Sequence, residues 1–288
     1  DGCMQANTTA SHNVAMGQAA LYSNTTGANN TASGGYALMY NTTGSQNTAC
    51  GWSALYTNTT ASYNTASGYS ALYSNTTGSH NTACGRSALH YNTTASYNTA
   101  VGYKALLTNT TGYSNVAVGK EALYYNTTGF HNQAVGQGSL WNNTSGEYNQ
   151  ALGANALYSN TTGTNNVAIG NQALYYNTAG TYNTGAGRRT LFSLTTGEGN
   201  TALGNHAGNN ITTGDFNCCI GYDAEPSSAT VDDEMVLGDN HIGTLRCNTS
   251  TISALSDARD KVEVEPSPLG IDFINTLNPV KFLWQSRE

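Results

Sequence analysis

The stretch N-T-A-S-G-G-Y-A-L-M-Y-N-T-T-G-S-Q, residues 30–46, is one copy of a unit that repeats along most of the chain. Its opening Asn returns every 17 residues without insertion or deletion, at Asn13, Asn30, Asn47, Asn64, Asn81, Asn98, Asn115, Asn132, Asn149, Asn166, Asn183, Asn200 and Asn217. Self-similarity at a short fixed period is typical of a solenoid, in which each repeat buries a face against its neighbours. We number the Asn as position 1, so that equivalent positions form columns along the stack.

The length and composition of the unit favour a β-coil. A helix-turn-helix repeat needs roughly 33 residues or more, and this unit is far shorter. Asn, Thr, Gly, Ser and Tyr dominate the repeats, whereas helix formers other than Ala and Leu are scarce. We therefore predict an all-β fold, a parallel β-solenoid or β-roll of 17-residue repeats, with two short strands and two turns in each repeat.

Two columns are predicted to form the interior of the coil. Position 9 is Leu in every unit from Leu21 to Leu191, and position 4 is usually apolar, as at Val101 and Ile169. Because neighbouring residues on a strand point to opposite faces, an inward position 4 places position 3 on the outside. Position 3 is nearly always Ala, which predicts that a second backbone packs there in a homotrimer. The alternative is that Ala simply suits a tight corner.

Glycine, asparagine and aromatic columns predict how the coil turns. Gly at position 5, such as Gly102, and at position 15, such as Gly112, predict corners with positive φ. Asn at position 12, such as Asn126, opens a turn, and stacked Asn side chains are expected to bond to one another and to the turn backbone. Aromatic residues recur at positions 10 and 17, where they either stack on each other or stack on host sugars.

Composition argues against several classes of function. Only 9% of residues are charged and the net charge is −7, so no basic surface follows nucleic-acid phosphates. No run approaches the roughly 20 apolar residues of a membrane span, so we expect no membrane insertion. Cys50 and Cys84 share position 4 two rungs apart, about 10 Å, which is too far for a disulfide, and they are expected in the core. We expect no metal and no cofactor.

The repeats resemble the head of trimeric bacterial autotransporter adhesins. Residues 98–105, N-T-A-V-G-Y-K-A, and 166–173, N-V-A-I-G-N-Q-A, are similar to the N/S-x-A-I/V-G-x-x-A motif of those heads. In that family the motif builds a left-handed parallel β-roll, although its unit is shorter than 17 residues. Similar N-T-T-G repeats occur in phage tail-fibre-like proteins. The resemblance implies a trimeric fibre.

The character of the chain changes after the repeats. We predict a solenoid shaft over residues 1–225 and a β-stalk or linker over 226–255, where V-D-D-E-M-V-L-G and I-G-T-L-R are typical of short strands. Residues 256–288 begin with S-D-A-R-D-K and continue to N-P-V-K-F-L-W. These motifs closely resemble the start of the endosialidase-type intramolecular chaperone, the self-cleaving C-terminal domain of phage tail fibres and tailspikes. The resemblance implies a helical fragment at the C-terminus.

The chaperone resemblance also implies a reaction. Ser256 is then the nucleophile and Lys261 its base, and they cut the peptide bond between Leu255 and Ser256. Asp257 and Arg259 complete the S-D-x-R-x-K signature and support the motif. A Ser-Lys pair requires a desolvated Lys with a lowered pKa. The alternative is a loop Ser beside a solvated Lys, with no cleavage.

The sequence thus predicts a structural and adhesive fibre, most specifically a phage tail fibre for host-surface attachment. The expected partners are two further copies of the chain and a host cell-surface glycan or protein, at a virion tail or cell surface. A secreted or cell-surface microbial filament is the first alternative. A glycan-degrading tailspike is a minor one, because the repeats hold few carboxylates and a glycosidase needs two facing acids. Threonine columns at positions 13 and 14 raise a third alternative, an ice-binding solenoid.

Overall fold

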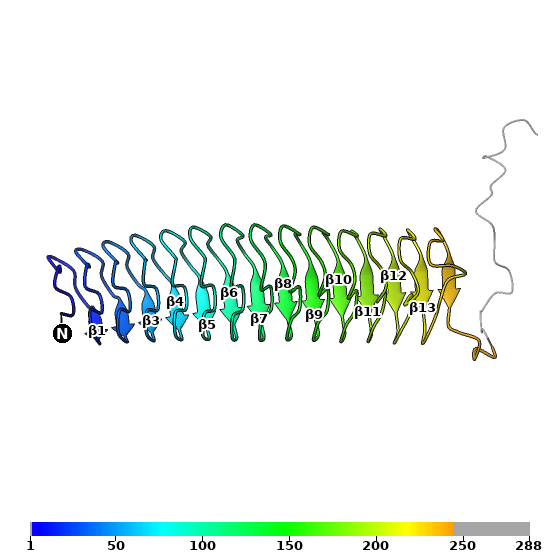
Figure 1. Ribbon diagram of the computed structural model, residues 1–288, viewed down its shortest axis with the longest axis horizontal. Helices are drawn as coiled ribbons and strands as arrows, with labels where there is room; N and C mark the ends of the chain where they lie inside the picture. Colours follow the sequence, from blue (N-terminus) through cyan, green and yellow to red (C-terminus); the bar gives the residue numbers. More distant parts are fainter. Residues whose placement is uncertain (1, 245–288) are drawn as a thin grey trace, which may run out of the picture. The chain divides into compact units, whose positions relative to one another are not determined.

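The computed structural model describes residues 2–244, which form one long stack of coils (Figure 1). The predictions made for Leu255, Ser256, Asp257, Arg259 and Lys261, and for a C-terminal helical fragment, fall outside the described residues.

Each coil contributes one strand of three residues, formed by positions 2–4 of the repeat. The strands are β1 (Val14–Met16), β2 (Thr31–Ser33), β3 (Thr48–Cys50), β4 (Thr65–Ser67), β5 (Thr82–Cys84), β6 (Thr99–Val101), β7 (Val116–Val118), β8 (Gln133–Val135), β9 (Gln150–Leu152), β10 (Val167–Ile169), β11 (Thr184–Ala186), β12 (Thr201–Leu203), β13 (Cys218–Ile220) and β14 (Met235–Leu237).

The strands pair in chain order into one parallel sheet of 14 strands (Figure 1). The register never shifts, so that Ala100 pairs with Ala117 and Val101 with Val118. At about 4.8 Å between strands, the stack is about 60 Å long. The prediction of an all-β parallel solenoid of 17-residue repeats is confirmed. The prediction of two strands per repeat is wrong for the described residues, because positions 6–17 form turns.

The turns are nevertheless bonded from rung to rung. The backbone N of Leu106 donates to the carbonyl of Ala122 at 2.9 Å, and that of Thr110 donates to Thr127 at 3.1 Å. Non-glycine residues at positions 7, 9 and 17 adopt left-handed φ, as at Lys104 (54°) and Leu106 (51°). Such a residue costs about 1–2 kcal/mol, and it persists where neighbouring rungs fix the backbone. These repeated bends replace the predicted second strand.

The strands face the opposite way from the prediction. The side chain of Ala100 at position 3 is fully buried, whereas Val101 at position 4 is 37% exposed. The interior is narrow, because the Leu column at position 9 fills it as predicted. One rung has Thr190 in place of the usual Ala at position 8, and its position 3 shrinks to Gly185. A Cβ on Gly185 would lie 2.5 Å from Leu174 Cδ1, so this rung has no room for a larger residue at position 3.

Buried asparagine side chains form hydrogen bonds between successive rungs in the interior of the coil. Asn126 Nδ2 donates to Asn109 Oδ1 at 2.8 Å and to the carbonyl of Gly129 at 2.9 Å. Asn115 at position 1 donates from Nδ2 to the same carbonyl at 2.8 Å and from its backbone N to Asn98 Oδ1 at 3.0 Å. The predicted bonding of the position 12 column is confirmed, and position 1 forms a second ladder. Buried amides are tolerated because they are paired.

The position 12 ladder ends where the repeat decays. Leu194 and Ile211 occupy position 12 in two of the last rungs, and both are fully buried. Asn177, one rung before Leu194, has a buried Oδ1 without a hydrogen-bond partner. The cause is local, because the side chain of Leu194 has no N–H to donate. The decay therefore begins with one unpaired acceptor inside the coil.

The two glycine columns have different roles. Gly102 at position 5 has φ +136°, and a Cβ there would lie 2.5 Å from the carbonyl oxygen of Gly119. Gly112 at position 15 is absent from the positive-φ residues, so the predicted positive φ is wrong for that column. Ala61 and Ala95 occupy position 15 in two rungs. Position 5 therefore requires Gly for conformation and space. Position 15 is also tight, because a Cβ on Gly112 would lie 2.3 Å from the carbonyl oxygen of Gly129, but it lacks the positive φ and accepts Ala in two rungs.

The sheet continues through β14, within residues 226–255. Met235–Leu237 pairs with β13 in the same register. Glu234 takes the place of the position 1 Asn, and its backbone N donates to Asn217 Oδ1 at 3.0 Å. Its carboxylate accepts a bond from Ser227 Oγ at 2.7 Å, and the Ser227 hydrogen bonds lower the pKa of Glu234. One more rung thus stacks after the last Asn of the pattern.

Candidate functional site

The outward side of the sheet carries positions 2 and 4 of every rung, and we call it the sheet face. Position 4 is the more apolar column, with Leu152 51% and Leu203 54% exposed. It comprises Met16, Ser33, Cys50, Ser67, Cys84, Val101, Val118, Val135, Leu152, Ile169, Ala186, Leu203, Ile220 and Leu237. Scattered apolar residues are normal on a surface, but a contiguous row marks an interaction site.

The chemistry of the sheet face changes along the stack. Strands β2–β5 present Thr at position 2 and only Ser or Cys at position 4. Strands β7–β10 present Val or Gln at position 2 and Val, Leu or Ile at position 4. The apolar character is therefore concentrated in the middle and later rungs.

Aromatic rings stack on one another at position 10. The rings of Trp141, Tyr158 and Tyr175 follow at centroid distances of 5.1 Å with interplanar angles of 2°. Position 17 behaves similarly, since His80 lies 4.8 Å from Tyr63 and 5.1 Å from Tyr97, with interplanar angles of 3°. Of the two interpretations of these columns, mutual stacking is confirmed. Contacts of this kind stiffen neighbouring rungs against each other.

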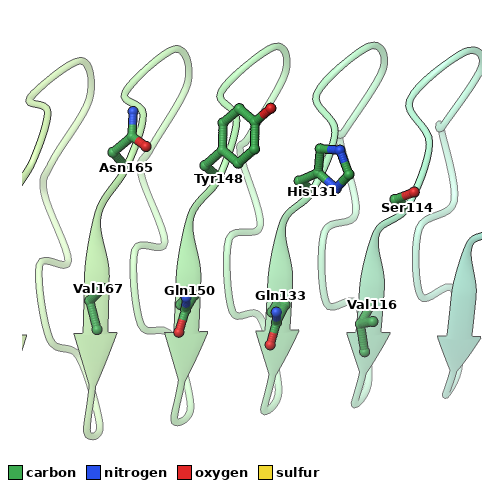
Figure 2. A pocket seen from close by; sticks show the side chains of 8 residues that line it. All are labelled: Ser114, Val116, His131, Gln133, Tyr148, Gln150, Asn165 and Val167. Carbon is green, nitrogen blue, oxygen red and sulfur yellow. The ribbon is translucent and has the colours of Figure 1, made fainter.

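A groove of about 480 Å³ runs across strands β7–β10 beside the sheet face (Figure 2). One wall comes from position 17 and the other from position 2, with the lining residues Ser114, His131, Tyr148 and Asn165 opposite Val116, Gln133, Gln150 and Val167. The lining includes no carboxylate, Lys or Arg side chain. It therefore offers hydrogen-bonding and aromatic groups without a fixed charge.

The two aromatic rings of the groove pack against each other and against a third ring. His131 and Tyr148 stack at a centroid distance of 5.1 Å with an interplanar angle of 19°. Phe130 at position 16 meets both rings edge-on, each at 5.4 Å. Edge-to-face contacts of this kind favour one orientation of each ring. The groove thus has a positioned aromatic wall.

A second polar cluster lies at the C-terminal end of the described chain. Asp239 Oδ2 is 2.6 Å from His241 Nδ1. The hydrogen bonds from His241 lower the pKa of Asp239, and the partnership raises the pKa of His241. Burial raises the pKa of the nearby Glu225 carboxyl. Even so, no group of three or more His, Cys, Asp and Glu side chains within residues 2–244 is arranged to hold a metal ion.

The cysteines divide between the two sides of the sheet. Cys50 and Cys84 are exposed at position 4, so the prediction that they lie in the core is wrong. Cys219 at position 3 is buried instead, and burial raises the pKa of its thiol to about 12. Both results follow from the orientation of the strands, which turns position 3 inward.

In comparisons with known proteins, no family model, no curated protein and no solved structure matches this chain. Within residues 2–244, no helix is long and apolar enough to cross a membrane.

Sequence reasoning missed the groove, although a signal was present. Position 2 is mostly Thr or Val, and Gln occurs there only at Gln133 and Gln150, in consecutive rungs. Position 16 is Ser from Ser45 to Ser96 and then becomes Tyr113 and Phe130. Two columns thus depart from their common residue within the same few rungs. Such coincident departures in a repeat indicate a local role.

Proposed function

We propose that the protein is a structural and adhesive fibre in which three parallel chains pack through the position 4 column of the sheet face, so that position 2 and the groove beside it stay outside the interface. The observation that supports this is the exposed position 4 column, which extends over all the described strands. A strip about 60 Å long and roughly 10 Å wide covers on the order of 600 Å² per chain. This is the same order as the roughly 800 Å² that each partner contributes to a standard interface.

The proposal moves the interface from the predicted position 3 to position 4. The Ala column that first pointed to a trimer is buried within each chain, so it is not available to a second chain. Packing position 4 of three chains around one axis instead removes apolar side chains such as Leu152, Ile169 and Leu203 from water.

A repeating interface creates a problem of register. Two identical stacks shifted by one rung still place position 4 against position 4, so many wrong pairings are nearly as favourable as the right one. A domain that joins the three chains at one end removes this ambiguity. This need supports the proposal that residues 256–288 begin an intramolecular chaperone that directs trimerisation, as in phage tail fibres.

The chaperone proposal includes self-cleavage before Ser256. Ser256 Oγ attacks the carbonyl carbon of Leu255, and Lys261 accepts the hydroxyl proton and passes it to the departing backbone N of Ser256. Water then hydrolyses the Leu255 ester, which leaves a carboxylate and a free Ser256. Mass spectrometry of the wild type, Ser256→Ala and Lys261→Ala tests this step. A new N-terminus at Ser256 in the wild type alone supports it, and three uncut chains, each at its own full-length mass, refute it.

Native cysteines test the interface. We expect Cys50, on the sheet face, to form disulfides between chains on mild oxidation of a Cys3→Ser, Cys84→Ser, Cys218→Thr, Cys247→Ser background. A matched chain that keeps Cys84 in place of Cys50 should cross-link equally. Each is expected to give covalent dimers, because three thiols around an axis can form only one pair.

Mixing the two chains before assembly tests the register, since one keeps only Cys50 and the other only Cys84 beside the buried Cys219. Cys50 and Cys84 are two rungs apart, about 10 Å, so in-register chains cannot bridge them. Mixed dimers in amounts equal to the homodimers would contradict parallel, in-register packing. Absence of any covalent dimer from either chain would contradict the interface itself.

Host-surface attachment, by a phage tail fibre or a microbial filament, remains the proposed role of the fibre. A glycan-degrading tailspike has less support, because the groove lining of the described rungs contains no carboxylate to act as acid or nucleophile.

Ice binding is a second candidate, favoured by one observation. Position 2 presents a single row of Thr on neighbouring strands, at Thr31, Thr48, Thr65, Thr82 and Thr99. Position 13, by contrast, uses its hydroxyls within the stack, since Thr127 Oγ1 donates to the carbonyl of Thr144 at 3.0 Å. A thermal-hysteresis assay decides this candidate. Activity in the wild type that is lost in Thr65→Lys supports it, and no hysteresis excludes it.

A further inference from the structure

We propose that the groove across β7–β10 binds a neutral glycan chain, with His131 and Tyr148 as its stacking platform and Gln133 and Gln150 as its hydrogen-bonding groups. The inference rests on the proposed adhesive function and assigns that function to a place on the shaft. Figure 2 shows the two rings along one wall and the two amides on the strands below them, on the same two rungs.

The rings have free surface to offer. Tyr148 is 49% exposed although it stacks on His131. The neighbouring rungs carry Ser114 and Asn165 at position 17, so no aromatic ring stacks in parallel on the outer side of either ring, although Tyr113 contacts His131 edge-on. In the earlier part of the column, His80 lies between Tyr63 and Tyr97 with both faces occupied. The end rings of that stack, Tyr63 and Tyr97, are 50% and 63% exposed, so both stacks offer ring surface to a pyranose. The two places differ at position 2, where Gln133 and Gln150 lie beside the groove rings and Thr82 and Thr99 lie beside His80 and Tyr97.

The amides complete the chemistry of a sugar site. Gln133 and Gln150 are exposed, and neither side chain hydrogen bonds to another described residue. Each amide has two N–H donors and a carbonyl acceptor, which match the neighbouring hydroxyl groups of a sugar. Binding pockets commonly combine an aromatic or apolar wall with a few such polar groups. The Thr that usually fills position 2 is shorter and offers a single hydroxyl.

Charge and direction define the ligand further. The lining contains no Lys or Arg to hold a carboxylate or sulfate and no Asp or Glu to hold an amine, which favours a neutral sugar. The binding groups repeat from rung to rung along the fibre axis. A chain of linked pyranose rings has a similar repeat, so we infer that it lies parallel to that axis and places one ring per rung.

The surroundings indicate a built site. Where position 16 is Ser, its hydroxyls form a ladder, with Ser62 Oγ accepting from the backbone N of Ser45 at 3.0 Å. Tyr113 and Phe130 interrupt that ladder and stack on each other at 4.9 Å. Tyr113 also meets His131 edge-on at 5.3 Å. At the rungs of the groove, aromatic side chains that contact the groove rings thus replace the Ser hydroxyls that bond to the backbone elsewhere.

Binding is measured on the full chain with four neutral tetrasaccharides, cellotetraose, chitotetraose, maltotetraose and mannotetraose, and with a heparin tetrasaccharide as the anionic comparison. Saturation-transfer NMR identifies the binder, and calorimetry gives its affinity. We expect at least one neutral probe to bind. The double variant Gln133→Thr/Gln150→Thr, which restores the common residue, should weaken that binding at least tenfold, and His131→Ser/Tyr148→Ser should abolish it.

The repeat supplies matched controls. His80→Ser/Tyr97→Ser removes the same kind of ring stack beside Thr82 and Thr99 and should leave affinity unchanged. No binding of any neutral probe, binding of heparin alone, or equal loss in the groove and control variants would each overturn the inference. The chain mass in solution is recorded on every sample. A monomer that binds a neutral sugar would refute the trimeric fibre and leave the glycan site standing. A trimer that binds none of the neutral probes would refute the glycan site and leave the trimeric fibre standing.

Discussion

The rungs of β2–β5 and those of β7–β10 have the same interior and different exteriors. In both regions Leu at position 9, Asn at positions 1 and 12 and Ala at position 3 are buried, and position 8 is small. On the sheet face, β2–β5 present Thr, Ser and Cys, whereas β7–β10 present Val, Leu, Ile and Gln. The inward columns therefore specify the fold, and the outward columns are free to differ along the shaft.

The comparison predicts that interior changes act equally in both regions. Leu72→Asp and Leu140→Asp each place a charge in a fully buried column. An unpaired buried charge costs far more than the stability of a typical domain allows, so we expect both variants to lose the folded array. Circular dichroism and urea unfolding measure this. A folded Leu140→Asp beside an unfolded Leu72→Asp would show that the two interiors differ.

The asparagine ladder should give a smaller but equally matched effect. Asn75→Ala removes the bonds of Nδ2 to Asn58 and Gly78 and the bond that Asn92 donates to Oδ1. Three bonds at about 1 kcal/mol each predict a loss of about 3 kcal/mol in the free energy of unfolding. Asn126→Ala in the other region removes the equivalent three bonds. Chemical denaturation should give the same loss within error, and a difference of more than about 1 kcal/mol would contradict equivalence.

Gly→Ala variants in the two glycine columns separate the effect of a positive φ from the effect of limited space. Gly102→Ala meets both a φ of +136° and the backbone of the next rung, so we expect a loss of about 2 kcal/mol or more. Gly112→Ala also meets backbone, since its Cβ would lie 2.3 Å from the carbonyl oxygen of Gly129, but it needs no positive φ and repeats a substitution present at Ala61 and Ala95. It should therefore cost less than Gly102→Ala. Thermal melting of the two variants checks the order. Equal shifts would mean that position 15 is as demanding as position 5.

Thiol reactivity gives the smallest effect and reports directly on strand orientation. Cys50 and Cys84 lie on the sheet face and should react with a thiol reagent in isolated chains. Cys219 is buried with a pKa raised to about 12, so its labelling should remain slow as the pH rises from 7 to 9. Thiolate is the reactive species, and little forms below that pKa. Rapid labelling of Cys219 in the folded chain would contradict an inward position 3.

The period, the Leu column and the Asn ladder of position 12 could be predicted because each leaves a mark in a single column. The orientation of the strands could not, since both Ala at position 3 and Val or Ile at position 4 suit an interior. Two facts decide it, the narrow space beside Leu174 and the inward hydrogen bonds of Asn115, and both arise only when rungs stack.

The absence of a second strand had no signal in the sequence, whereas the groove had one. Left-handed φ at Lys104 and Leu106 has no sequence signal, because neither residue favours it. The groove was visible in principle, through the paired departure to Gln133 and Gln150. The Ser256 and Lys261 prediction rests on resemblance and stays a prediction, since those residues are outside the described chain.

Sedimentation equilibrium on the full chain tests the central claim, that position 4 joins chains while the interior builds each one. The wild type is expected at three times its chain mass, which is 30.2 kDa before any cleavage at Ser256. Leu152→Lys/Ile169→Lys should sediment as a monomer with an unchanged circular dichroism spectrum, and Ser33→Lys/Ser67→Lys should weaken the trimer less. A wild type at 30.2 kDa, or a Leu152→Lys/Ile169→Lys variant that remains fully trimeric, would contradict the account.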